Sequence, residues 1–476
     1  MGQSLRYCQR YSKRWRASGD PLCDSALCAV FPHSASSVGK DLLSCLEEHA
    51  ARHPDSQPVT AFLDQVLCEP PTGIYVSPDE VHLAHEFFLD NCSEIIQALL
   101  HYSLAGGFAS PRIVRTLLAV SYLVPHSKRD TQLARQTRGS QVATDAPFVS
   151  DAASRISSTS NERTFSRLLE TFQFVLDVLG CSSPSTNSSE LVSEKLAQTR
   201  DPVAYLKPGG EGWSLAAFSA IPIWCLRRLH VPPSELHANA YLALWRHVGF
   251  YLGISPSILL RYFSGPDVAD KFIATAALHL FSADDGEDLA DAPTVPILRA
   301  ASNRPPTYTS FEYNCALSRH LLGPSLALRV GLGPPSISTL IRMHTVLFLQ
   351  RIPHLFAQWY PRRGWVIKRR AVLREGMARS LRWNLGMRRV SFRPRTAIKS
   401  TNVVSATQGI DEGGELAEGV KEAESIRPDP QGAAVLVRKW REVWMEMIGV
   451  CVGATAIGIG LGWSGARYME LHLYNV

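Results

Sequence analysis

The chain has 476 residues, of which 45% are hydrophobic and 19% are charged. This much apolar material can build a folded core, so a wholly disordered, collagen-like or disulfide-framework protein is excluded. The formal net charge of +6 is small for the length and gives no reason to expect a nucleic-acid partner.

The ten cysteines are scattered, and none forms a CxxC pair. Zinc-ribbon and thioredoxin-type sites are therefore excluded, and buried thiols in a reducing compartment are the expectation. The N-terminus is basic but no apolar stretch follows it, so it is not a secretory signal. We interpret residues 1–34 as a basic leader.

Helical patterns fill residues 35–395, and strand-type alternation is nearly absent. Ser77-Pro78-Asp79-Glu80 is typical of a helix start, and a Gly-rich break is expected at 105–111. Residues 126–161 are polar and predict an exposed loop. The later helices are expected at 162–180, 214–229, 234–253, 257–263, 266–281, 311–322, 325–332 and 336–360. The fold class is therefore all-α, with a single large helical domain over 35–395.

Charge is concentrated at the end of this domain. Twelve Lys or Arg residues lie within 362–395, against the single acid Glu375. This block fits either an anionic membrane surface or a solvated basic helix. Residues 396–437 are polar and acidic and predict a disordered linker.

The segment 438–476 resembles a membrane anchor. Met447–Trp463 is uncharged over 17 residues, which reach about 25 Å as a helix. Arg438, Lys439 and Arg441 precede it, and by the positive-inside rule they leave the main domain in the cytosol. The alternative is a Gly-rich helix buried in a cytoplasmic protein.

Familiar catalytic motifs are absent from the sequence. There is no GxGxxG, Walker loop, HExxH or GxSxG, so nucleotide-driven chemistry, zinc proteolysis and serine hydrolysis find no support. The acidic run Asp284–Asp291 lacks the EF-hand spacing and reads as a solvated loop.

Four stretches in order resemble one family: His101–Arg112, Glu162–Leu179, Asn239–Ile254 and Tyr313–Gly323. They are similar to the rubber oxygenase and latex clearing protein family, and more closely to its fungal branch. That branch includes the endoplasmic-reticulum-bound oxygenase of mycophenolic acid biosynthesis. The resemblance implies an all-helical domain that holds heme b through one histidine. It further implies cleavage or oxidation of an isoprenoid-type carbon–carbon double bond with dioxygen, at the endoplasmic reticulum membrane.

The resemblance also implies site residues. Arg167 and Thr171 match the family's Arg-x-x-x-Thr and share one helical face, from which they would reach dioxygen on the heme. The structural alternatives are an ion pair of Arg167 with Glu170 or Glu162, and a bond from the Thr171 hydroxyl to its own backbone.

The heme ligand is where the sequence departs from the family. Relatives carry a helix with Arg-Leu-Leu-His after a Gly-Trp, whereas here Trp213 runs straight into Ser214, as if that helix were deleted. His230 and His247 are the candidate iron ligands that remain, each with a structural or surface role as the alternative. Two functions follow: a heme-dependent oxygenase, or a degenerate, non-catalytic relative that acts as a membrane-associated scaffold.

Overall fold

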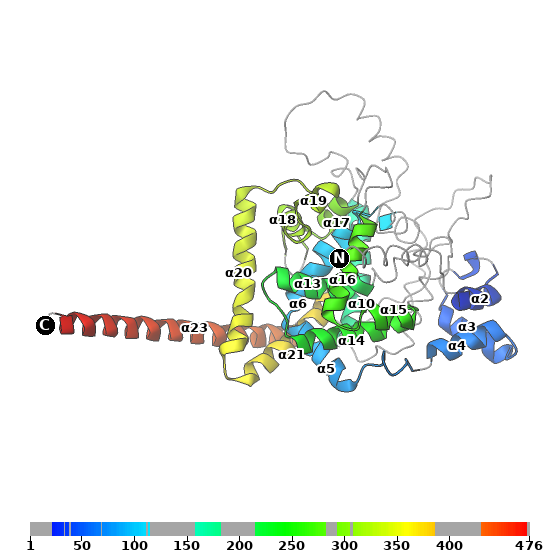
Figure 1. The fold of residues 1–476 in the computed structure, drawn as a ribbon, viewed down its shortest axis with the longest axis horizontal. Coiled ribbons are helices and arrows are strands. Elements are labelled where there is room, and N and C mark those ends of the chain that lie inside the picture. Colours follow the sequence, from blue (N-terminus) through cyan, green and yellow to red (C-terminus); the bar gives the residue numbers. More distant parts are fainter. Residues whose placement is uncertain are drawn as a thin grey trace, which may run out of the picture.

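All regular structure in the described part of the chain is helical. The computed structural model describes residues 21–32, 34–37, 40–67, 69–110, 113–114, 158–181, 215–281, 293–304, 308–385 and 430–473. No strand occurs within these ranges, and most helices pack into one body (Figure 1). The all-α prediction is therefore confirmed. Of the loop expected at 126–161, residues 126–157 lie outside the described residues, as does the Trp213–Ser214 junction, whereas residues 158–161 are helical and the loop prediction is wrong there.

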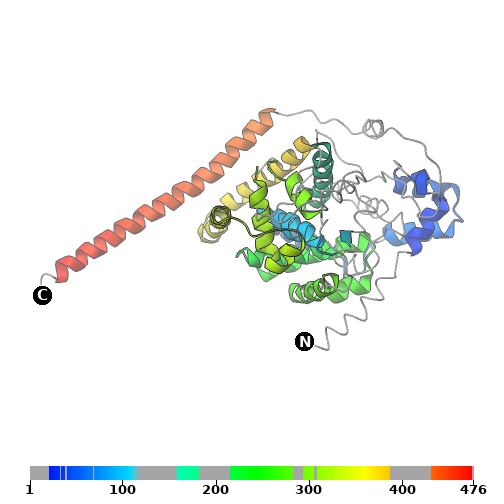
Figure 2. The same ribbon diagram turned by 90° about the horizontal axis from the view of Figure 1, so that it is seen from above.

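Three helices form the N-terminal group: α2 (Pro21–Val30), α3 (Leu42–Arg52) and α4 (Gln57–Leu67). They lie together at one end of the molecule (Figure 2). Cys23, Ala26 and Leu27 of α2 are buried, because a spacing of three and four residues puts them on one helical face. Residues 21–30, which were expected to be part of the basic leader, therefore form a helix with a buried face.

The next segment enters the core. α5 (Pro78–Asp90) begins where expected, with a capping box in which Ser77 and Glu80 satisfy each other's backbone N–H groups. It is followed by α6 (Cys92–Ala98), the π-helix η2 (Leu99–Leu104) and α7 (Ala105–Gly107). The expected break at 105–111 begins late, since helix continues through Gly107. A side chain at Gly106 would collide with Leu322, so glycine permits this close approach.

Most of the remaining helices match their expected ranges. They are α10 (Ser158–Val178), α13 (Ala220–Arg228), α14 (Glu235–Tyr251), α15 (Pro256–Tyr262), α16 (Pro266–Leu280), α17 (Thr294–Ala300), α18 (Phe311–Leu322), α19 (Pro324–Arg329) and α20 (Ile337–Trp359). The short α17 was not expected from the sequence. Phe174 and Phe218 both pack against Trp245 in the core. The Phe218 ring is stacked on Trp245 at 5.3 Å between ring centroids, and the Phe174 contact joins α10 to α14.

The basic block forms α21 (Arg363–Asn384), and part of its charge is used inside the protein. The Arg370 guanidinium binds both carboxylate oxygens of Asp90, with Nη2 2.6 Å from Oδ2, and it also pairs with Glu86. Both acids belong to α5. The interpretation as a purely membrane-facing or solvated block therefore needs correction, because one face of α21 is held by ion pairs to the core.

The last helix, α23 (Pro430–Leu473), begins inside the expected linker and continues well beyond the domain (Figure 1). Its first half docks on α21: Trp365 Nε1 donates to the Val443 carbonyl at 3.0 Å, and Tyr360 donates to Glu446 at 2.9 Å. Phe356, Trp365, Val443 and Met447 form a small separate core there. Residues 396–429 of the expected linker lie outside the described residues.

One described helix is long and apolar enough to cross a membrane, and it is Pro430–Arg467 of α23. Only 6% of its apolar window is buried, which distinguishes it from a core helix of a soluble protein. Among the described cysteines all are free, and Cys23, Cys92, Cys181 and Cys225 are buried. Burial raises the pKa of Cys92 to about 12, so that thiol stays protonated.

The core can be tested with two phenylalanines of opposite exposure. Phe88 is 0% exposed, whereas Phe348 of α20 is 61% exposed. Phe88→Ala removes a large buried side chain and is expected to lower the free energy of unfolding by about 3–5 kcal/mol. Phe348→Ala, the matched control, is expected to change it by less than about 1 kcal/mol. Denaturant unfolding in detergent measures both, and equal losses would contradict this core.

The docking of α23 is a separate prediction. Trp365→Ala removes the hydrogen bond to Val443 and the edge-to-face contact with Phe356, whose ring centroid lies 4.7 Å away. We expect the amides of residues 436–447 to exchange with deuterium at least tenfold faster, because the base of α23 then opens locally. Trp383→Ala, at 68% exposure on the same helix, is the control. Unchanged exchange in Trp365→Ala would mean that α23 does not depend on this contact.

Candidate functional site

The four stretches that carry the resemblance meet in the core. His101 of the first stretch bonds Ser318 of the fourth, and Phe174 of the second packs against Trp245 of the third at 6.3 Å between ring centroids. Segments separated by more than two hundred residues are thus in direct contact. One packing arrangement therefore accounts for the residue types of all four stretches.

His101 is the most deeply buried histidine among the described residues, with 4% of its surface exposed. Its Nδ1 lies 2.9 Å from the Ser318 hydroxyl, and no described group bonds its Nε2. Burial lowers the pKa of His101 to about 3, so its imidazole is neutral at physiological pH. A neutral imidazole with one nitrogen fixed by a neighbour is the form that binds a metal through the other nitrogen.

The backbone around His101 is unusual. η2 is a π-helix, and such local widenings of an α-helix are often found at functional sites. Two hydroxyl groups bind the segment to its neighbours: Ser103 of η2 donates to the Ala217 carbonyl at 2.7 Å, and Thr294 of α17 donates to the Ala105 carbonyl at 2.9 Å. The histidine is thus held in a rigid, internally hydrogen-bonded setting.

Arg167 and Thr171 lie on α10, as expected, but both side chains have partners on that helix. The Arg167 guanidinium pairs with the buried Glu170 carboxylate. The exposed Thr171 donates its hydroxyl to the Arg167 carbonyl at 3.2 Å. This geometry corresponds to the structural alternative for each residue. One link to η2 exists nearby, since Leu168 packs in a small cluster with Leu100 and Leu104.

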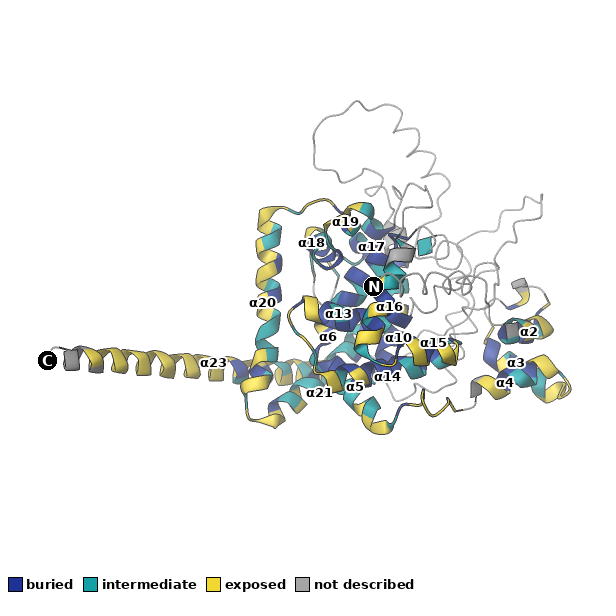
Figure 3. Cartoon of the chain, viewed as in Figure 1, coloured by how far each residue is buried: buried dark blue, intermediate teal, exposed yellow. Residues whose placement is uncertain are grey.

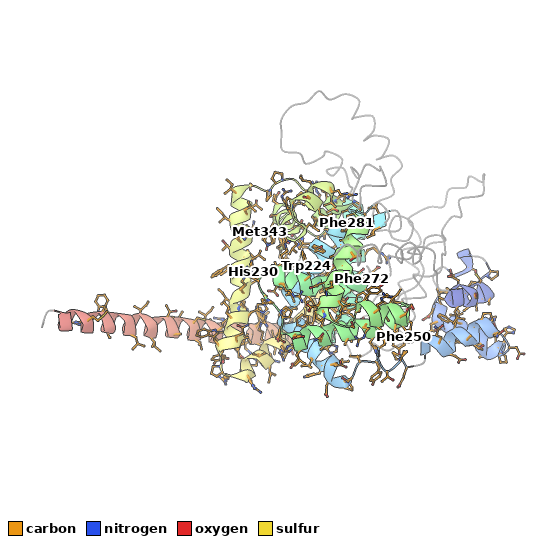
Figure 4. The ribbon with its side chains drawn as sticks, in the orientation of Figure 1. Trp224, His230, Phe250, Phe272, Phe281 and Met343 are labelled. Atoms are coloured by element: carbon orange, nitrogen blue, oxygen red, sulfur yellow. The ribbon has the colours of Figure 1, made fainter. Side chains whose placement is uncertain are left out.

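His230 lies at the end of α13, beside α20, with an exposed side chain (Figure 4). Its φ of 61° places it in the left-handed region, where it ends the helix. Burial first, and then Arg228, His344 and His230 nearby, lower the pKa of His320. His230 therefore belongs to a basic surface group and does not face the buried core.

His247 is half-buried on α14. The backbone N–H of Val76 donates to its Nδ1 at 3.4 Å, and the rings of Tyr75 and Tyr251 lie edge-on to it at 5.9 and 5.4 Å between centroids. Burial lowers the pKa of this imidazole. These contacts give it a packing role between α14 and the loop before α5. Among the described residues, His230, His247, Arg167 and Thr171 thus have separate partners and do not form one network of contacts.

The chemistry that the described residues support is that of a single buried nitrogen donor. No group of three or more His, Cys, Asp or Glu side chains in the described ranges is arranged to hold a metal ion. A heme needs only one protein ligand, because the porphyrin supplies the other four nitrogens. His101 was not singled out as a ligand from the sequence, since a lone histidine on an apolar helix gives no signal of its own burial or of Ser318 opposite.

A comparison with protein families finds a match to one family model. Residues 139–352 match the model described as "ER-bound oxygenase mpaB/B'/Rubber oxygenase, catalytic domain". Neither the curated proteins nor the solved structures yielded a match. The matched range contains α10 through most of α20, and with it three of the four stretches on which the resemblance rests. Residues 139–352, a little under half of the chain, are therefore similar to the catalytic domain of ER-bound oxygenases and rubber oxygenases.

Proposed function

We propose that this protein is a heme-dependent oxygenase that cleaves or oxidises an isoprenoid-type carbon–carbon double bond with dioxygen. The family match supports the oxygenase class. The observation that carries the proposal is the buried, neutral His101, whose Nδ1 is fixed by Ser318. We further propose that α23 anchors the protein in the endoplasmic reticulum membrane with the main domain in the cytosol.

The residues fit a heme b through His101. The imidazole is neutral, and in the tautomer whose Nδ1–H donates to the Ser318 hydroxyl the Nε2 lone pair is available to a metal without the loss of a proton. Its orientation is set by a second residue, which is the usual arrangement for a metal-binding histidine. His230 and His247 fit this role less well, because one is exposed and the other already accepts a backbone hydrogen bond.

When bound, the heme would supply the iron centre at which dioxygen reacts. The contribution of the protein is to hold and orient the reactants and to keep water away. His101 would supply the nitrogen donor, and the rigid η2 segment would fix its direction. Arg167 of α10 would supply positive charge to the site. In this structure the Glu170 carboxylate pairs with that charge. The Thr171 hydroxyl, on the same face one turn later, would supply a hydrogen bond to a polar group.

An apolar substrate is supported by the proposed anchoring of the protein through α23. An isoprenoid chain has no charge to bind, so it needs an apolar site with few polar groups. A membrane-anchored enzyme would also meet a lipid-soluble substrate where that substrate concentrates.

The second candidate is a non-catalytic, membrane-associated scaffold. Two observations favour it: Arg167 and Thr171 are both engaged within α10, and the family's histidine helix is missing from the sequence after Trp213. In this case the helical core would be kept for its shape. Heme binding separates the two candidates.

The first test is heme binding. The full chain, expressed with heme supplied, is expected to show a Soret band and to oxidise a polyisoprenoid with uptake of dioxygen. His101→Ala should lose at least nine-tenths of the Soret absorbance at equal protein, because it removes the iron-binding nitrogen. His230→Ala and His247→Ala are matched controls that should keep the band. Circular dichroism checks that each variant is folded.

Different outcomes would reject different parts of this proposal. A folded chain without a Soret band supports the scaffold. A band that survives in His101→Ala but disappears in His230→Ala or His247→Ala would assign the ligand to the latter position and would refute the role of His101.

A second test uses the pH dependence of stability. Burial lowers the pKa of His101 to about 3 in the folded chain, whereas in the unfolded chain this pKa has its ordinary value of about 6.5. Between these values the unfolded chain binds the proton and the folded chain does not, so stability falls as pH decreases. His101→Gln should lessen that loss between pH 6 and pH 4 by on the order of 1 kcal/mol per pH unit in the apoprotein.

Denaturant unfolding at a series of pH values measures this slope. His82→Gln is the matched control, because the His82 side chain is 73% exposed. If the slopes of wild type and His101→Gln coincide, His101 is not buried in a neutral form.

A further inference from the structure

One face of α20 is apolar and exposed. The stripe consists of Ile337, Ile341, Phe348, Leu355 and Trp359, with exposed fractions of 76, 63, 61, 54 and 87%. The spacings of four, seven, seven and four residues keep these side chains on one side of a helix with 3.6 residues per turn. An apolar stripe that runs the length of a 23-residue helix marks an interaction surface.

Another side of α20, about 120° around the helix from the stripe, is fixed to the protein. Met343 and Leu347 are buried in the main core. Near the C-terminal end, His354 Nε2 lies 3.1 Å from the buried Glu94 carboxylate of α6. α20 is therefore packed on the domain, which sets its position. The stripe is the outward-facing surface of this helix.

The position of α20 relative to α23 is the key observation. In Figure 1 α20 stands upright as the outermost element of the domain, on the side toward which α23 runs, and α23 crosses it. In Figure 2 α20 is seen nearly end-on, and α23 again passes beside it. Figure 3 shows the exposed surface of α20 next to the exposed length of α23. If α23 crosses a bilayer, α20 thus lies along the bilayer surface.

The level of α20 along α23 fits the membrane boundary. Leu349 and Ile352 of α20 line an apolar groove of about 310 Å³ together with α23. The α23 side chains in the groove are Trp444, Met447, Ile448, Cys451 and Val452. These positions span about 12 Å of helix and include the first residues of the uncharged segment. α20 therefore sits where the hydrocarbon of the bilayer would begin.

The charges just before this level are mainly positive, with Glu442 as the exposed acid among residues 438–442. Arg438, Lys439 and Arg441 are exposed on the preceding turns of α23, and Trp440 and Trp444 lie beside them. Cations of this kind attract anionic headgroups, and tryptophan favours the interface. Lipid headgroups would thus contact the basic turns of α23. Acyl chains would contact the apolar surface formed by α20 and the uncharged part of α23.

We propose that α20 is an in-plane membrane helix whose Ile337–Trp359 stripe inserts into the cytosolic leaflet beside α23. This inference rests on the proposed anchoring by α23. The bilayer is favoured over a second copy of the chain because the stripe continues onto the exposed apolar surface of α23, which itself needs lipid around it. Two membrane elements that cross each other fix the orientation of the catalytic domain, whereas a single anchor would let it rotate.

The test uses the full chain in vesicles of phosphatidylcholine and phosphatidylserine. An environment-sensitive fluorescent amino acid is placed at position 348 or, as the matched control, at position 236. Leu236 lies on α14 and is 63% exposed, close to the 61% of Phe348. We expect a blue shift and at least twofold quenching by acyl-chain-brominated lipid at 348 and no change at 236. Protection of a C-terminal tag from protease reports insertion of α23 in the same sample.

A charge variant gives a second readout. With the fluorescent residue at position 359, the double variant Ile341→Glu, Phe348→Glu should lose at least half of the lipid quenching. Leu236→Glu should lose none. Both variants change exposed side chains, so circular dichroism should show an unchanged helical fold.

The outcomes separate this inference from the anchor. A protected tag with no quenching at 348 overturns the in-plane helix and leaves the anchor intact. An unprotected tag with no quenching rejects both. A blue shift at 348 that needs no lipid and grows with protein concentration would show that a second copy covers the stripe, and it would also overturn the proposal.

Discussion

The burial of η2 against α18 is the constraint on which the rest of the domain depends. Gly106 lets this segment approach Leu322 closely, and a buried His101 must then find a polar partner, which Ser318 provides at 2.9 Å. Once this contact is fixed, α17 closes the same end through the Thr294 bond to Ala105. The aromatic packing of Phe174, Phe218 and Trp245 then joins α10 and α14 to it. The resemblance is concentrated in these segments because they must fit one another.

The fold class and most helix ranges could be predicted because they depend on local signals. Periodic apolar residues and the Ser77 capping box report directly on helices. The N-terminal boundary and α17 could not be predicted as easily. α2 has ten residues and α17 has seven, and such short helices are stabilised mainly by tertiary packing of residues such as Cys23 and Ile297.

The site was less predictable than the fold, for a physical reason. A histidine at position 101 could be a surface, core or ligand residue, and only its burial and the opposing Ser318 distinguish these roles. Arg167 and Thr171 illustrate the reverse case. Their spacing correctly places them on one helix, but spacing does not reveal that Glu170, three residues away, is buried and pairs with the guanidinium. Partners that depend on the third dimension decide what each polar residue can do.

The basic block and the last helix show how the domain and the membrane could share one set of residues. Arg370 of α21 binds Asp90 and Glu86 of α5, while Trp365 on the same helix packs against α23. α21 is therefore a rigid support between the core and α23. Because α20 is itself fixed to the core through Met343 and Glu94, the angle at which α23 leaves the domain is set by packed contacts and not by a flexible linker. A bilayer around α23 would then meet the catalytic domain in one orientation, with the apolar side of α20 toward the acyl chains.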